Sequence, residues 1–357
     1  MKSKICVVTT RNIFDSPCLD KYRQIIKEPF DIIYWDRCNI DENCGAENYY
    51  KFNGYIKPGA SKFKKLFKYI GFTKFAKTIL RKNDYEKLIV FPTQTAWLIE
   101  KELKGQYKKK YLLDIQDYAG ENNKIINRKT KNAIKNSAIC SITSPAYTKF
   151  LPNQDYVVSH NVQNIDTSLI ESYRSRERSA DKPIVLSFIG SVRFIDQQKR
   201  LINLFKNDKR FVLKFIGSGS EQLKSFVEEE KVENVILIGR FKREELGGFY
   251  VDTDMAINVY GNNDPYLDYA LSNKLYSAAL MGMPILVSTN TYMADIAEEF
   301  GIGFAVDLEE ANITSKLYEY YTSLKVDDLL NGCDAFMKQV NNDEVNYREK
   351  IDKWIKS

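Results

Sequence analysis

Two glycine-containing segments in the second half of the chain have residues suited to binding phosphate. They are residues 189–193 (IGSVR) and residues 215–220 (FIGSGS), and each follows an apolar run that predicts a strand. Glycine lets the backbone approach a ligand closely, and backbone N–H groups at a helix N-terminus hold anions. Gly190, Gly217 and Gly219 therefore predict an anion cradle at the carboxyl edge of a parallel sheet.

Three cations near the first segment would supply the positive side of a diphosphate site. They are Arg193, Lys199 and Arg200, and such groups bind phosphate through charge-assisted hydrogen bonds. The alternative is that the glycines only form tight strand-to-helix turns. The chain has no Gly-Lys-[Ser/Thr] P-loop and no Gly-x-Gly-x-x-Gly motif, which disfavours a nicotinamide cofactor.

Aspartates and the single histidine are the candidates for moving a proton. Asp114 and Asp117 follow a strand predicted at 111–114, and an aspartate at such an edge can accept a hydroxyl proton. Capping a helix N-terminus is the alternative role for either one, and Asp117 is the preferred catalytic candidate. His160 follows a strand predicted at 156–159. It is either a structural hydrogen-bonding residue or a second catalytic candidate.

A resident metal is not expected. The six cysteines form no Cys-x-x-Cys pair and the chain has one histidine, which disfavours a zinc site. No acidic metal-binding pair is visible either. The short apolar run at the N-terminus and the lack of any stretch of about 18 apolar residues argue against a signal peptide and a membrane-spanning helix. The expected location is the reducing cytoplasm.

Residues 57–82 combine positive charge with an apolar pattern. They contain no acidic residue and nine basic ones, namely Lys57, Lys62, Lys64, Lys65, Lys68, Lys74, Lys77, Arg81 and Lys82. Apolar residues recur at i, i+3, i+4 and i+7 over 63–70 and again, after Gly71, over 72–79. This spacing predicts two short amphipathic helices with cationic flanks.

Such helices can rest on an anionic membrane surface, where each basic residue contributes up to ~1 kcal/mol. The alternative is a helix pair whose aromatic residues enter the core, which explains the apolar pattern but not the nine positive charges. A nucleic-acid partner is not expected, because no RNA- or DNA-binding motif accompanies the basic segment.

Short apolar runs alternate with helix-length segments along the chain. The runs are 5–9, 30–35, 88–91, 111–114, 138–142 and 156–159, and then 184–189, 211–216, 235–238, 255–259 and 284–287. This alternation predicts βαβ units whose parallel strands are covered on both faces. The fold class is therefore α/β, with two consecutive doubly wound domains.

The boundaries of these domains follow from composition. Residues 171–182 are polar and charge-dense, which predicts a linker between domains 1–170 and 183–335. The remaining segment, 336–357, has apolar residues at helical spacing over 347–355 and predicts an amphipathic helix that packs back on the body.

Charge is divided unequally between the two halves. Residues 1–180 carry 32 Lys and Arg against 19 Asp and Glu, whereas residues 181–357 carry 21 against 28. A basic half joined to an acidic half suggests two domains with different partners, one of them anionic.

Four segments of the second domain resemble the donor half of GT-B glycosyltransferases. They are 185–191 (VLSFIGS), 215–219 (FIGSG), 235–240 (VILIGR) and 279–288 (ALMGMPILVS). The chain is most similar to the large family 4 (group 1) enzymes of cell-surface polysaccharide assembly. Looser matches in the first domain are 15–17 (DSP), 113–118 (LDIQDY) and 150–162 (FLPNQDYVVSHNV).

The resemblance implies two Rossmann-like domains facing a cleft, with a UDP- or GDP-linked sugar bound mainly by the second domain. By position, Arg193 and Lys199 would contact the donor diphosphate, and Gly217 and Gly219 would let it approach. In this setting Asp117 would be the base for the acceptor hydroxyl, and His160 would contact the sugar or the acceptor.

Other positions of the family pattern concern the base and the ribose. Gly239, Arg240 and Phe241 would flank the nucleotide base through backbone contacts. Family 4 enzymes usually carry two glutamates eight positions apart, and the aligned positions here are Tyr269 and Ser277. Both carboxylates are therefore missing, and Ser277 would make only a weaker ribose contact.

Nearby residues are candidates to replace these glutamates. Asp264 and Asp268 lie close in sequence and are candidates for acting beside the sugar. Asn273 and Lys274 belong to an Asn-Lys-Leu segment that resembles a divergent polysaccharide branch of the family. Lys274 stands at a predicted helix start, the positive end of the helix dipole, where a lysine adds to an anion site.

The resemblance thus implies a metal-independent, retaining glycosyltransferase. It would move a sugar onto a lipid-diphosphate-linked glycan of a capsule, exopolysaccharide or O-antigen, as a peripheral protein at the inner face of the cell membrane. The missing glutamates leave a second hypothesis, an inactive GT-B subunit that supports a partner transferase. A third, another sugar-nucleotide enzyme such as a 2-epimerase, would need more histidines and carboxylates than this chain has.

Overall fold

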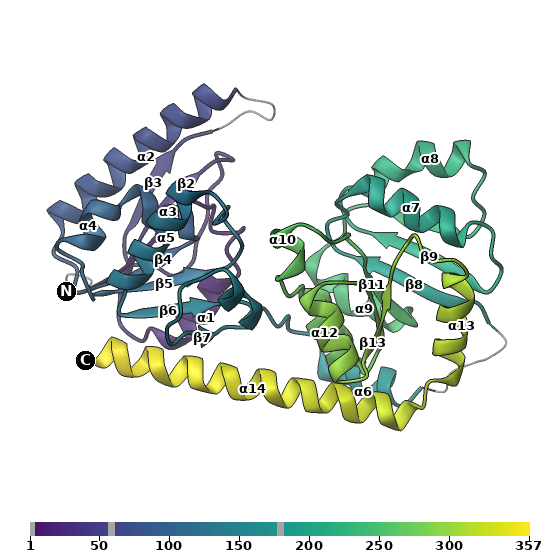
Figure 1. The fold of residues 1–357 in the computed structure, drawn as a ribbon. Coiled ribbons are helices and arrows are strands. Elements are labelled where there is room, and N and C mark those ends of the chain that lie inside the picture. The colour runs from purple at the N-terminus through teal and green to yellow at the C-terminus, as the bar shows by residue number, and fades with distance from the viewer. Residues whose placement is uncertain (1–3, 56–60, 177–181) are drawn as a thin grey trace. The chain divides into compact units, whose positions relative to one another are not determined.

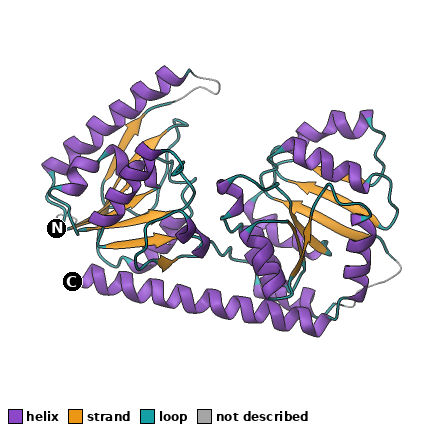
Figure 2. Cartoon of the chain, viewed as in Figure 1, coloured by secondary structure: helices purple, strands orange, loops and turns teal. Residues whose placement is uncertain are grey.

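The computed structural model describes residues 4–55, 61–176 and 182–357. The chain folds into two compact units. The first consists of Met1–His160 together with Asn342–Ser357, and the second of Asn161–Asn341. Each unit contains one parallel sheet flanked by helices (Figure 2). The predicted α/β class with two doubly wound domains is therefore confirmed.

The boundary between the units differs from the linker predicted at 171–182. Residues soon after His160 already pack in the second unit, where Ile165 is buried in the core. Helix α6 (Thr167–Arg174) lies in this unit as well. Residues 177–181 of the predicted linker lie outside the described residues. The charge-dense segment 171–182 thus begins within helix α6, which belongs to the second unit.

The first unit has seven parallel strands in the order β3-β2-β1-β4-β5-β6-β7. In chain order they are β1 (Ile5–Thr9), β2 (Phe30–Asp36), β3 (Tyr49–Asn53), β4 (Lys87–Phe91), β5 (Tyr111–Ile115), β6 (Ile139–Ile142) and β7 (Val157–Val158). Apolar runs predicted all of them except β3, which is half-exposed at the sheet edge and whose sequence, YYKFN, mixes aromatic with polar residues.

Helices cover both faces of this sheet (Figure 1). One face packs against α1 (Cys18–Ile25) and the last part of α14 (Val326–Lys356), whose Tyr347 and Ile351 are buried in the same core. Further helices of this unit are α3 (Thr93–Leu98), α4 (Glu100–Lys104) and α5 (Lys124–Asn136), followed by the 3-10 turn η1 (Pro145–Lys149). The helix predicted at 347–355 is therefore confirmed, as the end of a much longer one.

Helix α2 (Lys62–Lys82) corrects the prediction of two short helices in the basic segment. It continues through Gly71, where the lack of a side chain fits the packing: a Cβ on Gly71 would lie 3.0 Å from the Phe52 ring. The two halves differ in burial. Phe72 and Leu80 are fully buried, whereas Phe63 and Phe67 are 76% and 72% exposed. The core-helix alternative therefore holds for the second half only.

The second unit has six parallel strands in the order β10-β9-β8-β11-β12-β13. They are β8 (Ile184–Ile189), β9 (Phe211–Ile216), β10 (Val235–Ile238), β11 (Met255–Asn258), β12 (Ile285–Ser288) and β13 (Gly303–Val306). All of them except β13 coincide with apolar runs that predicted a strand. The apolar part of β13 is too short for its pattern to stand out.

Helices also lie on both faces of the second sheet. One core forms around α7 (Ile195–Phe205), α8 (Lys224–Glu229) and α13 (Ile313–Ser323). The other forms around α6, α9 (Leu246–Val251), α11 (Asn273–Met281), α12 (Tyr292–Glu299) and the first part of α14. Shorter elements are η2 (Ser220–Leu223), η3 (Arg243–Glu245) and α10 (Pro265–Asp268). In the described parts of the chain, no helix is long and apolar enough to cross a membrane.

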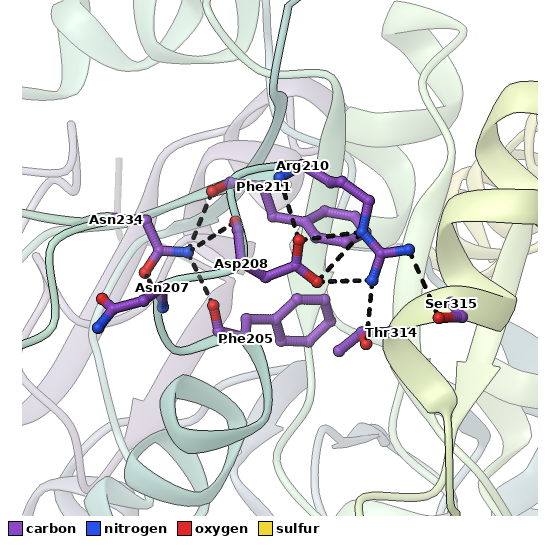
Figure 3. A network of polar contacts seen from close by, with 8 residues as sticks. All are labelled: Phe205, Asn207, Asp208, Arg210, Phe211, Asn234, Thr314 and Ser315. Atoms are coloured by element: carbon purple, nitrogen blue, oxygen red, sulfur yellow. Dashed lines mark hydrogen bonds and ion pairs between the residues drawn. The ribbon is translucent and has the colours of Figure 1, made fainter.

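A polar network fixes the amino ends of β9 and β10 (Figure 3). The Asn234 side chain donates to three backbone carbonyl groups, those of Phe205, Asp208 and Phe211. The Arg210 guanidinium binds the Asp208 carboxylate and reaches Thr314 and Ser315 on α13. These contacts fix the position of the turn before β9 relative to its neighbours. They lie at the amino ends of the strands, opposite the carboxyl edge of the sheet.

Candidate functional site

The candidate site lies where β8 pairs with β11. The order of strands along the chain reverses at this point, and doubly wound sheets bind ligands outside the carboxyl ends of the strands there. Three groups of residues meet at this edge. Residues 190–194 follow β8, Tyr260 follows β11, and Lys274 is the second residue of α11.

Lys274 is the central cation of the site. Its side chain is buried, with 7% of the residue exposed. Its Nζ lies 2.8 Å from Tyr260 Oη and 4.1 Å from the centroid of the Phe188 ring. A Cβ on Gly190 would lie 4.0 Å from the same Nζ. The absent side chain at Gly190 therefore leaves room beside the ammonium group.

The charges around Lys274 determine its chemistry. Burial, and then the positive charge of Arg193, lower the pKa of Lys274 to about 7. Burial raises the pKa of Tyr260 to about 12, so the phenol stays neutral near pH 7. Within the described residues, Lys274 forms no ion pair with a carboxylate. Because a buried charge without a counter-charge is costly, this edge is suited to a bound polyanion such as a diphosphate.

Arg193 and Phe194 form the exposed rim of the site. Arg193 makes no ion pair within the described residues, so its guanidinium adds to the positive potential. Phe194 has φ 54°, is 40% exposed, and its ring centroid lies 5.3 Å from that of Tyr260. A bulky residue rarely adopts positive φ, and such backbone clusters at functional sites.

The predicted glycines have two different roles. Gly190, Gly217 and Gly219 all have positive φ. A Cβ on Gly217 would lie 2.0 Å from the Gly190 carbonyl oxygen, and one on Gly219 would lie 2.3 Å from that of Val192. These two glycines let neighbouring loops pack backbone against backbone, as the tight-turn alternative requires. Gly190 is the glycine that lies next to Lys274, and a contact of the other two with a diphosphate stays a prediction.

The two other predicted cations of α7 have partners of their own. Lys199 Nζ lies 5.4 Å from the centroid of the Phe226 ring on α8. Arg200 forms an ion pair with Glu309. The site thus brings Arg193 and Lys274 together, and the contact of Lys199 with the donor stays a prediction.

The residues predicted near the base follow β10. Arg240 is exposed, and Phe241 is half-buried with its ring 5.1 Å from that of Phe249. The predicted base contacts involve the backbone of this segment. The packing of the Phe241 side chain does not test them, so they stay a prediction.

The positions that replace the family glutamates differ in accessibility. Ser277 is fully buried and its hydroxyl bonds Gln163 Oε1 at 3.3 Å, so its ribose contact stays a prediction that needs a rearrangement. Asn273 is half-buried at the start of α11. Asp264 caps α10, whereas Asp268 has a buried carboxylate oxygen without a hydrogen-bond partner in the described parts, and burial raises its pKa.

No three His, Cys, Asp or Glu of the described residues gather as a metal site would require.

The predicted base of the first unit lies at the carboxyl edge of β5. Asp117 Oδ2 is 3.1 Å from Arg11 Nη2, and the same guanidinium donates to Gln116 Oε1 at 2.9 Å. Asp114 is buried and accepts hydrogen bonds from Ser141 and Gln116. Asp117 is therefore the carboxylate of this pair that ligands can reach, and its role as base stays a prediction.

His160 ends the first segment of the first unit and contacts the part of α14 that belongs to the same unit. It is 3% exposed, and its Nε2 lies 3.0 Å from Asp343 Oδ2. Its backbone N–H donates to Glu344 Oε1 at 2.6 Å. Burial lowers the pKa of the imidazole, against the opposing effect of Asp343. These contacts match the structural alternative, and a catalytic role for His160 stays a prediction.

Sequence reasoning missed Tyr260 and Phe194. Neither belongs to a motif, and both are aromatic residues that follow predicted strands of the same sheet. Their position at two neighbouring carboxyl ends is the signal that could have identified them, since such ends meet at one edge.

Comparison with known structures identifies the fold. The chain is similar over 99% of its length to 100% of HepE from Anabaena in complex with UDP, with a TM-score of 0.70 and 13% identity. It is similar over 98% of its length to 99% of the sucrose-phosphate synthase of Thermosynechococcus elongatus, with a TM-score of 0.69 and 13% identity. The chain has the GT-B fold.

Further comparisons agree with the GT-B assignment. The lipopolysaccharide glycosyltransferase WaaG is similar over 98% of each chain, with a TM-score of 0.60 and 10% identity. HepE has also been solved with UDP-glucose, and that structure matches this chain with a TM-score of 0.66 at 12% identity. No protein-family model matches the sequence, and neither does any curated protein. At these identities, the similarity concerns the GT-B fold.

Proposed function

We propose that this GT-B protein is a glycosyltransferase that takes its sugar from a UDP- or GDP-linked donor. The observation that carries the proposal is that two cations, Arg193 and the buried Lys274, lie near each other at the β8–β11 edge. When a nucleoside diphosphate leaves the anomeric carbon, negative charge develops on the diphosphate, and cations placed in advance stabilise it. HepE, which has the same fold, has been solved with UDP and with UDP-glucose.

The residues divide the chemistry between the two units. The bond between the anomeric carbon and the diphosphate oxygen breaks, and a bond to the acceptor oxygen forms with retention of configuration. Arg193, Lys199 and Lys274 neutralise the leaving diphosphate without a metal. Asp117 takes the proton of the acceptor hydroxyl, and Asp268 lies beside the donor sugar, where its unpartnered oxygen can accept a hydroxyl hydrogen bond.

The acceptor in this proposal is a lipid-diphosphate-linked glycan of a capsule, exopolysaccharide or O-antigen. The protein would act at the inner face of the cell membrane, held there by the first half of α2. The exposed Phe63 and Phe67, with Lys64, Lys65 and Lys68 beside them, support this part of the proposal.

Binding of UDP and GDP, measured by calorimetry, tests the donor site. We expect micromolar binding of one nucleotide and at least tenfold weaker binding by Arg193→Ala, because a charge-assisted hydrogen bond is worth about 1.5–3 kcal/mol. Lys224→Ala on α8 is the matched control, since this lysine is exposed and pairs with Glu228. Binding that is the same in Arg193→Ala and the wild type would refute the donor site.

An inactive subunit that supports a partner transferase is the second candidate. The observation that favours it is the replacement of both family glutamates by Tyr269 and the buried Ser277. Slow release of free sugar from the donor that binds best separates the two functions. A transferase hydrolyses its donor slowly without an acceptor, whereas an inactive subunit binds the nucleotide without turnover.

A further inference from the structure

The lysine at the centre of the donor site is buried among groups that give it no negative counter-charge. β8 contributes the Phe188 ring and the bare backbone of Gly190, and the segment before α7 contributes Arg193. The segment after β11 contributes the Tyr260 hydroxyl. Among the described residues that face Lys274 from these elements, Arg193 is the charged one and Tyr260 the other titratable one.

We propose that Lys274 takes up a proton when the nucleotide diphosphate of the donor binds. The donor itself then creates the ammonium group that faces the leaving diphosphate. The proton comes from solvent and adds to the lone pair of Nζ, which turns an amine into an ammonium, and no bond of the donor breaks in this step. This inference rests on the proposed function and states how pH regulates the same site.

The physical reason is the change in charge around Nζ. Without an anion, burial and Arg193 lower the pKa of Lys274 to about 7, so the amine form prevails at pH 8. A diphosphate next to Nζ reverses the balance, because an opposite charge within about 4–6 Å favours the charged form. Tyr260 Oη suits both forms, since a phenol can donate to an amine or accept from an ammonium.

Proton uptake is measured by calorimetric titration of UDP and GDP in buffers with different heats of ionisation. At pH 8 the terminal phosphate of a nucleotide is already ionised, because its second pKa is about 6. We therefore expect the wild type to take up more than about half a proton per nucleotide at pH 8. At pH 6 Lys274 is already charged and takes up no proton, whereas the half-protonated terminal phosphate should release protons on binding. Nucleotide affinity should also fall about tenfold per pH unit above pH 8.

Variants of two lysines assign the uptake to one residue. In Lys274→Arg the cation keeps its charge, so the heat of binding should no longer depend on the buffer. Lys274→Met should bind the nucleotide more weakly and also without uptake. Lys199→Met is the matched control, because Lys199 is only half-buried; it should weaken binding and leave the uptake as in the wild type.

Two outcomes would overturn the inference alone. One is nucleotide binding by the wild type at pH 8 with no buffer dependence, and the other is uptake that persists in Lys274→Arg. Failure of both UDP and GDP to bind would overturn the proposed function and this inference with it. The wild-type comparison of pH 8 with pH 6 decides the matter even where a variant does not fold.

Discussion

Lys274 is unusual because it is buried near another cation, Arg193, without a carboxylate partner among the described residues. Its position at the start of a helix could be predicted from the sequence, and Arg193 could be singled out as a second cation. Its burial and its contacts with Phe188 and Tyr260 could not, because they depend on how three segments far apart in the chain meet at one sheet edge. Single residues were thus predicted best where a motif marked them.

Replacing this lysine should stabilise the ligand-free protein. The unfolded chain holds the Lys274 proton up to pH 10.5 and the folded protein only up to about 7. Folding is therefore opposed most below pH 7, and less as pH rises towards 10.5. Lys274→Met should raise the free energy of unfolding at pH 7 by up to about 4 kcal/mol, at about 1.4 kcal/mol per pKa unit.

Denaturant unfolding at pH 7 and pH 10 measures this effect. The gain from Lys274→Met should shrink between the two pH values. Lys199→Met, at a half-buried position, should change the free energy of unfolding by less than about 1 kcal/mol. A Lys274→Met protein that is less stable than the wild type at pH 7 would contradict the charge penalty.

At the scale of elements, strands were predicted more accurately than helices. Continuous apolar runs mark strands that are covered on both faces, and β8 and β9 have the predicted bounds. Helix α2 shows where the pattern misleads. Gly71 looked like a helix break, yet it lies inside one helix, and the absence of its side chain makes room for Phe52. The sequence also could not show that the apolar pattern of α2 is buried only in its second half.

The exposed half of α2 leads to a prediction about membrane binding. Phe63→Ser with Phe67→Ser should lower binding to vesicles containing phosphatidylglycerol at least tenfold, because burying a Phe side chain is worth about 1.5–3 kcal/mol. Both side chains are largely exposed, so the change should leave stability as it is. Vesicle co-sedimentation measures the binding.

Controls distinguish membrane binding through α2 from nonspecific binding through exposed apolar side chains. Phe14→Ser removes another exposed phenylalanine of the same unit, 63% exposed, and should leave vesicle binding unchanged. Vesicles of phosphatidylcholine alone should bind the wild type more weakly, since Lys64, Lys65 and Lys68 then lose the anionic surface. Equal sedimentation of the Phe63/Phe67 variant and the wild type would rule out α2 as the anchor.

At the scale of the whole molecule, the chain passes between the two units twice, at His160–Asn161 and within α14 at Asn341–Asn342. Both passages meet in one network of the first unit. Lys21 Nζ lies 2.7 Å from Glu344 Oε1 and also binds the His160 carbonyl oxygen. The domain boundary could not be predicted from composition, because this network depends on residues distant in sequence.

Weakening this network should free the end of α14. Glu344→Gln removes the charge that Lys21 and the His160 N–H share, which should cost about 1.5–3 kcal/mol. Amide hydrogen exchange should then quicken over Asn342–Ser357 and stay unchanged over the part of α14 in the second unit. Glu349→Gln, at an exposed position of the same helix, is the control and should alter neither part. Uniform exchange in both parts would contradict the role of Glu344.

The packing of Tyr347 and Ile351 against the first sheet bears on the order in which the protein is completed on the ribosome. A nascent chain that has emerged only to His160 lacks the two side chains that close the core of its own first unit. The second unit is continuous in sequence, so its residues are all available sooner. The unit that is synthesised first therefore receives its last core residues only after the whole second unit has been made.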